Sequence, residues 1–217
     1  MTQPHAHVRL VVRRAALDDV DALRELRLRA LWADPQAFGS TYERELERTS
    51  TDWACWITPD PSFFLCTDDG GRVGLAAGYH DSVEPGTVML AAVWIEPSAR
   101  GRGGVALLVD AFVRWAATKQ PTAVKLWVVA TNDVARRAYE RCGFEPTGQT
   151  LARTRDGVVE LEMSLPFARL AQVVSAARTT SATSPTESGR SSSLTPRSRG
   201  DAAPSTSIDS ASTPPRS

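Results

Sequence analysis

Short apolar runs and helix-like apolar spacings alternate along most of the chain. Runs rich in β-branched and aromatic residues predict strands, at residues 8–12, 62–67, 72–80, 87–95, 125–130, 143–151 and 156–165. Apolar residues recurring every three or four positions predict helices, at residues 18–32 with Asp18 as N-cap, at 40–48, at 51–57, after the glycines of residues 101–104, and at 132–142.

The order of these elements predicts the fold class. Asp and Gly residues at 68–71 and at 156–157 lie between apolar runs and indicate antiparallel hairpins. The run 87–95 is apolar throughout, which suits a central strand buried on both faces. We therefore expect an α+β fold, with a mixed, mostly antiparallel sheet of about six to seven strands and helices on both faces.

The composition bounds the domain content and the partners. The 217 residues carry a formal net charge of zero, which gives no electrostatic reason to expect nucleic acid or a membrane as a partner. We place one folded domain at residues 8–167. Residues 175–217 are dominated by Ser, Thr and Pro and can bury little apolar surface, so a disordered tail is expected there.

The spacing of the cysteines and the length of the apolar runs indicate the cellular compartment of the protein. Cys55, Cys66 and Cys142 lack the spacing of a disulfide framework or a zinc site, so no metal is expected. The N-terminus has no apolar segment, and the longest apolar run, residues 88–95, is too short to cross a bilayer. These features favour a cytoplasmic protein.

A glycine-rich turn with two arginines precedes one of the predicted helices. The first amides of a helix are unpaired and lie at the positive end of its dipole, so a phosphate can bind there. The spacing Gly101-x-Gly103-x-x-Ala106 also matches a loosened dinucleotide fingerprint, but extra residues separate the strand from the glycines and the next strand ends without an acidic residue. A turn that only lets the helix pack closely, with no anion, is the alternative.

Residues 88–144 resemble the core of the GCN5-related N-acetyltransferase (GNAT) superfamily, and the likeness extends over residues 8–167. Members carry Arg/Gln-x-x-Gly-x-Gly/Ala between a central strand and a helix, then an Asn before a helix that bears a Tyr and is followed by Gly-Phe. The matching residues are Arg100, Gly103, Asn132, Tyr139 and Gly143-Phe144. One position departs, because Val105 stands where the second small residue is expected and Gly104 lies one place earlier.

The resemblance implies an N-acetyltransferase that moves an acetyl group from acetyl-CoA to a primary amine by direct attack in a ternary complex. The central strand would hold the pantetheine arm, the turn would hold the pyrophosphate, and Asn132 would lie beside the reaction centre. The implied cofactor-binding residues are Val93, Trp94, Ile95, Arg100, Gly101, Arg102, Gly103, Gly104, Val105, Ala106 and Asn132. Tyr139 occupies the position of the general acid that protonates the CoA thiolate, and Cys142 is not positioned beside it as a nucleophile.

The sequence does not identify the general base. An alkyl ammonium, with a pKa of about 10.4, must lose a proton before the amine attacks. Many relatives place a Glu on a central strand, but this chain has Trp127 there. The candidates are Glu43, Glu45, His80 and an ordered water, although both glutamates also fit a solvated helix face and His80 fits a surface position at a strand end.

The acceptor is equally open. Small-molecule amines, peptide N-termini and protein lysines are all compatible with the sequence, as is a monomer or a homodimer. Five aromatic residues could line an acceptor pocket or belong to the core, namely Phe38, Tyr42, Trp53, Trp56 and Trp94. A core position is favoured for at least half of these five. The missing strand carboxylate and Val105 leave a second hypothesis, a non-catalytic acyl-CoA-binding regulatory module.

Overall fold

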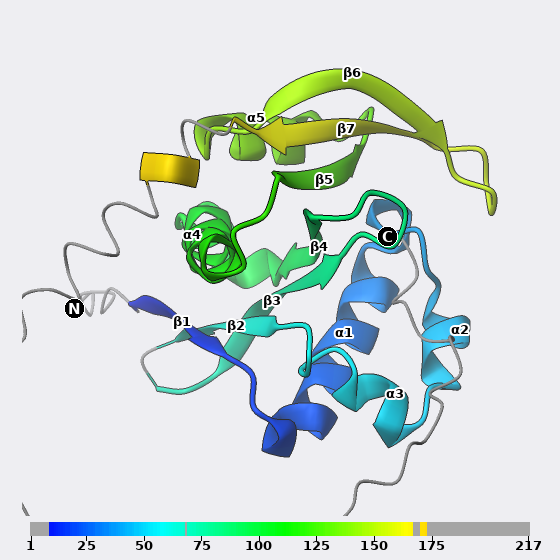
Figure 1. Ribbon diagram of the computed structural model, residues 1–217. Helices are drawn as coiled ribbons and strands as arrows, with labels where there is room; N and C mark the ends of the chain where they lie inside the picture. Colours follow the sequence, from blue (N-terminus) through cyan, green and yellow to red (C-terminus); the bar gives the residue numbers. More distant parts are fainter. Residues whose placement is uncertain (1–8, 68, 167–169, 173–217) are drawn as a thin grey trace, which may run out of the picture.

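The computed structural model describes residues 9–67, 69–166 and 170–172, so the predicted tail at 175–217 lies outside the described residues. Seven strands form one sheet with helices on both faces (Figure 1). The strands are β1 (Leu10–Arg14), β2 (Ser62–Thr67), β3 (Arg72–His80), β4 (Thr87–Ile95), β5 (Ala123–Val129), β6 (Glu145–Ala152) and β7 (Val159–Leu165). The α-helices are α1 (Val20–Ala33), α2 (Tyr42–Leu46), α3 (Ser50–Ala54), α4 (Gly104–Thr118) and α5 (Asp133–Arg141).

The sheet has the order β1-β2-β3-β4-β5-β7-β6. Neighbouring strands are antiparallel except for β4 and β5, which are parallel. The structure therefore confirms the mixed, mostly antiparallel α+β fold. Three predicted strands, 62–67, 72–80 and 87–95, have the observed bounds, whereas the first strand begins later than expected and β5 begins earlier.

The start of α1 differs from the prediction. Residues 17–19 form a 3-10 turn and α1 begins at Val20, so Asp19 rather than Asp18 stands at its N-cap. The Asp19 carboxylate accepts hydrogen bonds from Arg13 on β1 at 2.6 and 2.7 Å and from Arg72 on β3 at 3.0 Å. These bonds, those from Arg13 above all, hold the pKa of the Asp19 carboxyl well below its usual range. One buried carboxylate thus ties the start of α1 to two strands.

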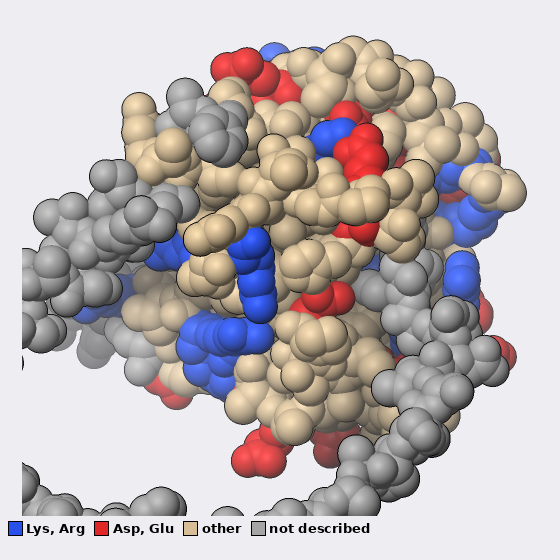
Figure 2. All heavy atoms as spheres, viewed as in Figure 1, with Lys and Arg blue, Asp and Glu red and all other residues tan. Residues whose placement is uncertain are grey.

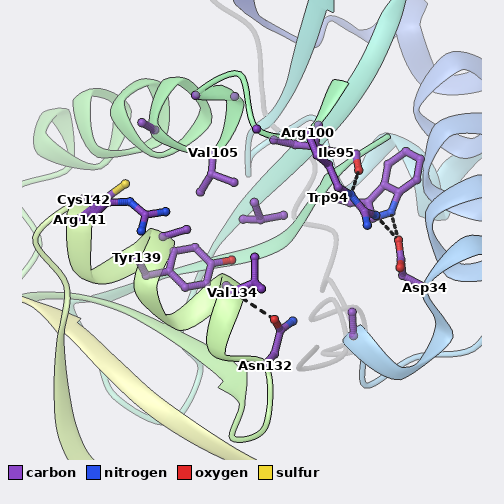
Figure 3. Close-up of a pocket in the computed structure, with 18 residues that line it drawn as sticks. Asp34, Trp94, Ile95, Arg100, Val105, Asn132, Val134, Tyr139, Arg141 and Cys142 are labelled. Atoms are coloured by element: carbon purple, nitrogen blue, oxygen red, sulfur yellow. Dashed lines mark hydrogen bonds and ion pairs between the residues drawn. The ribbon is translucent and has the colours of Figure 1, made fainter. Parts of the chain in front are cut away.

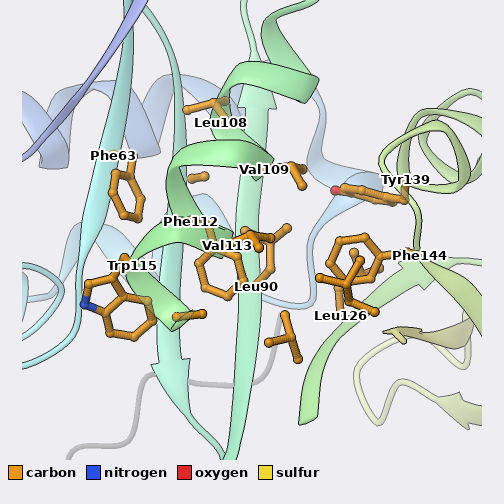
Figure 4. Close-up of a cluster of buried hydrophobic side chains, with 14 of the residues drawn as sticks. Phe63, Leu90, Leu108, Val109, Phe112, Val113, Trp115, Leu126, Tyr139 and Phe144 are labelled. Carbon is orange, nitrogen blue, oxygen red and sulfur yellow. The ribbon is translucent and has the colours of Figure 1, made fainter. Parts of the chain in front are cut away.

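Apolar side chains form a core on each face of the sheet. On one face, α4 and α5 pack around Phe112, Leu108 and Phe144, which are almost completely buried (Figure 4). On the other face, α1 and the short helices bury a second cluster that includes Trp53 and Phe64. Strand β4 contributes to both clusters, as expected for a central strand buried on both faces.

The two parallel strands separate at their carboxyl ends. The β4–β5 register covers only residues 87–90 against residues 123–126. Beyond that point, β4 continues to pair with β3 as far as Ile95, and β5 continues to pair with β7 as far as Val129. The sheet is therefore forked, and one edge of each strand faces the gap without a neighbouring strand.

A β-bulge accompanies this fork. Ala92 has a φ of 53°, and the β3–β4 register shifts between Leu75 and Ala77. A bulge bends its strand and increases the local twist, which directs the end of β4 away from β5. The left-handed conformation costs an L-residue about 1–2 kcal/mol. Ala92 is buried, and β4 pairs with β3 on both sides of it.

Charge is distributed without a dominant sign. In Figure 2, basic and acidic side chains are scattered over the visible face, and neither sign forms a continuous field. Among the described residues, no helix is both long and apolar enough to cross a bilayer.

Candidate functional site

A cavity of about 730 Å³ opens between the carboxyl end of β4 and the first turns of α4 and α5 (Figure 3). Its volume is within the range of small-molecule sites. It brings together almost all of the residues singled out in the sequence, namely Val93, Trp94, Ile95, Arg100, Gly101, Gly103, Gly104, Val105, Ala106, Asn132 and Tyr139. Of the predicted cofactor-binding residues, Arg102 is the one that does not line the cavity.

The glycines of the turn are required for two different reasons. Gly101 and Gly103 have φ values of 75° and 78°, a left-handed conformation that glycine adopts without strain. Gly104 is limited by space instead, because a Cβ there would lie 2.5 Å from Leu65 Cδ2 and 2.8 Å from Ile95 Cδ1. The sequence therefore allows a sharp turn and then lets the start of α4 lie directly on the sheet.

The start of α4 offers unpaired amides to the cavity. The N–H of Leu107 is the first to bond within the helix, to the carbonyl of Gly103 at 3.3 Å, so the amides of residues 104–106 have no intrahelical partner. They lie at the positive end of a helix that runs to Thr118. Val105 is half-buried and its side chain points into the cavity in Figure 3. Val105, the residue that departs from the family pattern, therefore lies on the cavity wall.

Asp34 joins three elements at one end of the cavity. Its carboxylate accepts hydrogen bonds from the indole Nε1 of Trp94 at 2.7 Å and from the guanidinium of Arg100. The Nε of Arg100 also donates to the carbonyl of Ile95 at 2.9 Å. Arg100 therefore holds the turn onto the end of β4, and Asp34 attaches both to the end of α1.

Tyr139 projects its hydroxyl into the cavity (Figure 3). The side chain is buried and its ring contacts Phe144 edge-on, with centroids 6.2 Å apart. The hydroxyl makes no hydrogen bond with any described residue, so it can still donate to a ligand. Burial, with a smaller contribution from Cys142, raises the pKa of Tyr139 well above its usual range. The phenol consequently keeps its proton at neutral pH.

Helix α5 supplies further lining residues that the sequence analysis did not single out. They recur at helical spacing around Tyr139, a periodicity that could have identified them, and they are Val134, Ala135, Ala138 and Arg141; Cys142, weighed above as a nucleophile, also lines the cavity. Asn132 caps α5 by accepting the Ala135 N–H at 3.1 Å, which leaves its amide nitrogen as a donor. Cys142 is half-buried, and burial raises the pKa of its thiol. A neutral thiol is a weak nucleophile.

The cavity includes none of the proposed bases. The interpretation of Glu45 as part of a solvated helix face is wrong, because this residue is completely buried. Arg27 donates to its carboxylate at 2.9 and 3.0 Å and stacks over the ring of Phe38 at 4.4 Å. Glu45 is therefore one half of a buried ion pair, and removing one partner of such a pair typically costs about 3–5 kcal/mol.

The other two candidate bases, Glu43 and His80, do not line the cavity either. Glu43 is exposed. His80 is exposed and pairs with Val88 at the first half of β4, the opposite end from the fork. The preference for the core among the aromatic residues is confirmed: Phe38, Trp53 and Trp56 are buried, whereas only Trp94 of the five lines the cavity.

Two carboxylates of β7, which the sequence analysis did not single out, do not line the cavity. Glu160 and Glu162 pair with Val129 and Trp127, on the edge of β5 that faces away from the fork. Their alternation in the run VELEMSL is the signal that could have placed both on one face of a strand. Among the described residues, no group of three or more His, Cys, Asp or Glu side chains is arranged to hold a metal ion.

Comparison with known proteins agrees with this geometry. Residues 26–144 match the model of the acetyltransferase (GNAT) family. The chain is similar to a mycothiol acetyltransferase of Mycobacterium leprae, with 32% identity over 159 residues that cover 64% of this chain and 48% of that protein. It spans about half to 60% of the length of the curated relatives that it matches.

Two solved structures illustrate the shared fold. A GCN5-related N-acetyltransferase from Kribbella flavida superposes with a TM-score of 0.59 at 23% identity, covering 73% of this chain and 98% of that one. A spermidine N-acetyltransferase from Vibrio cholerae, solved with CoA and spermine, gives a TM-score of 0.57 at 16% identity, covering 75% and 98%. The family model spans more than half of the 217 residues, and the fork, the glycine turn and Tyr139 occupy one cavity; the chain therefore belongs to the acetyltransferase (GNAT) family.

Proposed function

We propose that the chain is an acetyl-CoA-dependent N-acetyltransferase that acetylates a primary amine by direct attack in a ternary complex. The observation that carries this proposal is that the unpaired Tyr139 hydroxyl and the unpaired amides at the start of α4 face one cavity at the fork. Family membership supports an acyl-CoA donor. The relatives named for mycothiol and spermidine acetylation support a small-molecule amine as acceptor.

The cavity fits the two polar parts of acetyl-CoA. The amides of residues 104–106 and the positive end of α4 suit the pyrophosphate. The free edge of β4 at Val93–Ile95 suits the amides of the pantetheine arm, which would pair with it as a strand does. Asn132 offers an amide donor nearby. Arg100 holds the turn onto β4 with its bonds to Ile95 and Asp34, which use two of its five N–H donors.

Acetyl-CoA supplies the activated acetyl group, and the residues of the chain handle the protons. Tyr139 keeps its proton at neutral pH because burial disfavours the phenolate. The protonated hydroxyl, which has no partner among the described residues, is available to hydrogen-bond to the sulfur and to donate its proton as the thiolate leaves. The neutral thiol of Cys142 favours direct transfer over an acetyl-enzyme. A stable acetylated form of the unchanged chain, detected by mass spectrometry, would contradict this route.

Two assays on one plate test the proposal. Thermal shift with CoA, acetyl-CoA and NAD measures binding, and CoA thiol release is followed across a panel of amines that includes spermidine. We expect stabilisation by the CoA compounds but not by NAD, as expected for a ligand that binds only the folded state, and amine-dependent thiol release. Stabilisation without thiol release for any amine would instead favour the non-catalytic acyl-CoA-binding module, which Val105 and the absence of a carboxylate at Trp127 keep open.

A further inference from the structure

We propose that Arg153 is a positioning residue for the acceptor amine, because it holds the loop that forms the acceptor-side wall of the cavity. That wall is the α1–α2 loop, residues 34–41, and Arg153 belongs to the β6–β7 loop, residues 153–158. Both loops lie at the same side of the molecule (Figure 1). The inference rests on the proposed function, and it adds a residue that acts on the acceptor and not on the donor.

The α1–α2 loop borders the cavity on the face of the sheet away from α4 and α5. The groups that suit the donor, namely the amides of residues 104–106 and the hydroxyl of Tyr139, come from α4 and α5. Asp34 and Ala37 of the loop line the same cavity, and Phe38 packs into the core of α1 on the other face. An amine that reaches the thioester from this other face therefore passes the α1–α2 loop.

Arg153 bonds to the backbone on either side of a cavity residue. Its guanidinium donates to the carbonyls of Gln36 at 3.2 Å and Phe38 at 2.6 Å. Ala37, between these two carbonyls, lines the cavity. The Arg153 side chain is only 5% exposed, so water competes little for its bonds. Arg153 therefore fixes the place of Ala37 from a loop more than 100 residues further along the chain.

Asp156 orients two arginines of the β6–β7 loop toward the α1–α2 loop. Its carboxylate accepts from Nε and a terminal nitrogen of Arg153, both at 3.2 Å, and from Arg155 at 2.7 and 3.2 Å. Arg155 in turn donates to the carbonyls of Phe38 and Ser40, both at 3.2 Å. Its hydrogen bonds, above all, lower the pKa of the Asp156 carboxyl, which stays charged at neutral pH. Both guanidiniums are thus held in a fixed direction.

Phe38 joins the α1–α2 loop to both parts of the forked sheet. Its buried ring lies against the Arg27 guanidinium at 4.4 Å, and Arg27 forms the buried ion pair with Glu45. The ring therefore belongs to the core of α1 and strands β2–β4, whereas the carbonyl is bound by the loop that follows β6. The α1–α2 loop thus spans from one part of the sheet to the other beside the open fork.

A lysine at position 153 separates the loop bonds from the charge. Arg153 also lies 3.7 Å from the buried carboxylate of Glu160, so a neutral replacement would leave that carboxylate without its nearest cation. Lysine keeps the positive charge but lacks the planar fork that can donate to two carbonyls at once. Arg153→Lys is therefore the substitution that weakens the hold on the α1–α2 loop with the least change of charge.

The kinetic test compares the full chain with Arg153→Lys, using the panel amine that gives the fastest thiol release. We expect the KM for the amine to rise about tenfold or more, because binding must then also order the loop. The KM for acetyl-CoA and the thermal shift with CoA should not change. Arg155→Gln alters a partly exposed side chain and should raise the amine KM by a smaller factor; it carries the test if Arg153→Lys does not fold.

Hydrogen exchange measured by mass spectrometry reports on the loop independently of acetyl transfer. Arg153→Lys should speed amide exchange in residues 36–41 and leave exchange in α1 unchanged. The matched control is Arg114→Lys on α4, since Arg114 is exposed and pairs with Asp110 one helical turn away at 2.9 Å. This control should alter neither the kinetics nor the exchange of the loop.

Three results would overturn the positioning role in a chain that transfers acetyl groups. The first is an equal rise in the KM for the amine and for acetyl-CoA, as in a general loosening of the fold. The second is a lower kcat with both KM values unchanged. The third is faster exchange of the loop with an unchanged KM for the amine. No transfer by the unchanged chain with any amine would instead contradict the proposed function, and the role of Arg153 with it.

Discussion

Tyr139 combines a ring fixed in the core with a hydroxyl that has no partner among the described residues. Its ring is fixed against Phe144 in the core of α4 and α5, while its oxygen reaches the cavity without a protein partner. The hydroxyl can therefore still donate a hydrogen bond, and it keeps its proton because burial, which raises its pKa, disfavours the phenolate.

Replacing this hydroxyl separates catalysis from binding. We expect Tyr139→Phe to lower kcat for acetyl transfer by about 10²–10⁴-fold, the usual contribution of a positioned acid. The ring contacts remain, so the thermal shift with CoA should persist. Steady-state kinetics and thermal shift on the same preparation check this. A variant with unchanged kcat would remove Tyr139 from the mechanism.

Gly104 is a second residue whose effect follows from a few contacts. Gly104→Ala would press a Cβ against Leu65 and Ile95, both buried, and overpacking of this kind costs about 1–3 kcal/mol. Urea unfolding measures the loss. In a Leu65→Ala background the same substitution should cost less, because the closest atom is gone. Strictly additive costs in the double-mutant cycle would show that the steric account is wrong.

At the scale of elements, a single carboxylate, that of Asp19, ties the start of α1 to β1 and β3. Asp19 → Asn should cost about 1–3 kcal/mol at pH 7, since the charged hydrogen bonds to Arg13 and Arg72 are lost. The folded-state pKa of Asp19 is depressed, so its stabilisation is present above the unfolded pKa of about 3.9 and fades as pH falls below it. Unfolding curves of the two proteins should therefore converge in acid.

The neighbouring residue provides the control for this prediction. Asp18 is exposed in the 3-10 turn, so Asp18→Asn should leave stability and its pH dependence nearly unchanged. Equal effects of the two substitutions would indicate a general effect of charge near the helix start, instead of the specific bonds of Asp19.

The elements were predictable where local pattern determines them. The hairpin of β2 and β3 and the apolar β4 follow from turn residues and periodicity, which act over a few positions. The N-cap at Asp18 and the solvated position of Glu45 are wrong predictions, because the environments of Asp19 and Glu45 depend on arginines of other elements, Arg13, Arg72 and Arg27. The motif residues of the cavity were predictable from the resemblance, whereas Asp34 reaches it from the end of α1 through its bonds to Trp94 and Arg100, which come from other elements.

At the scale of the whole molecule, the sheet is two parts joined by a short parallel ladder. Strands β1–β4 form one part and β5, β7 and β6 form the other, with only residues 87–90 and 123–126 paired between them. We expect CoA to slow amide hydrogen exchange in residues 91–95, where the free edge of β4 would gain partners, and to leave β1 unaffected. Exchange measured by mass spectrometry with and without CoA tests this, and protection confined to α4 would contradict pairing along β4.

If the proposed donor binds in the fork, the fork would also link the stability of the chain to the concentration of that ligand. A ligand seated in the gap would contact both parts of the sheet, and at a concentration 100 times its Kd it would add about 2.7 kcal/mol to the free energy of unfolding. That is a large share of the 5–15 kcal/mol typical of a folded domain. Because the bend at Ala92 opens the fork in which the ligand would bind, a higher cellular concentration of CoA compounds would make the protein more resistant to proteolysis as well as more active.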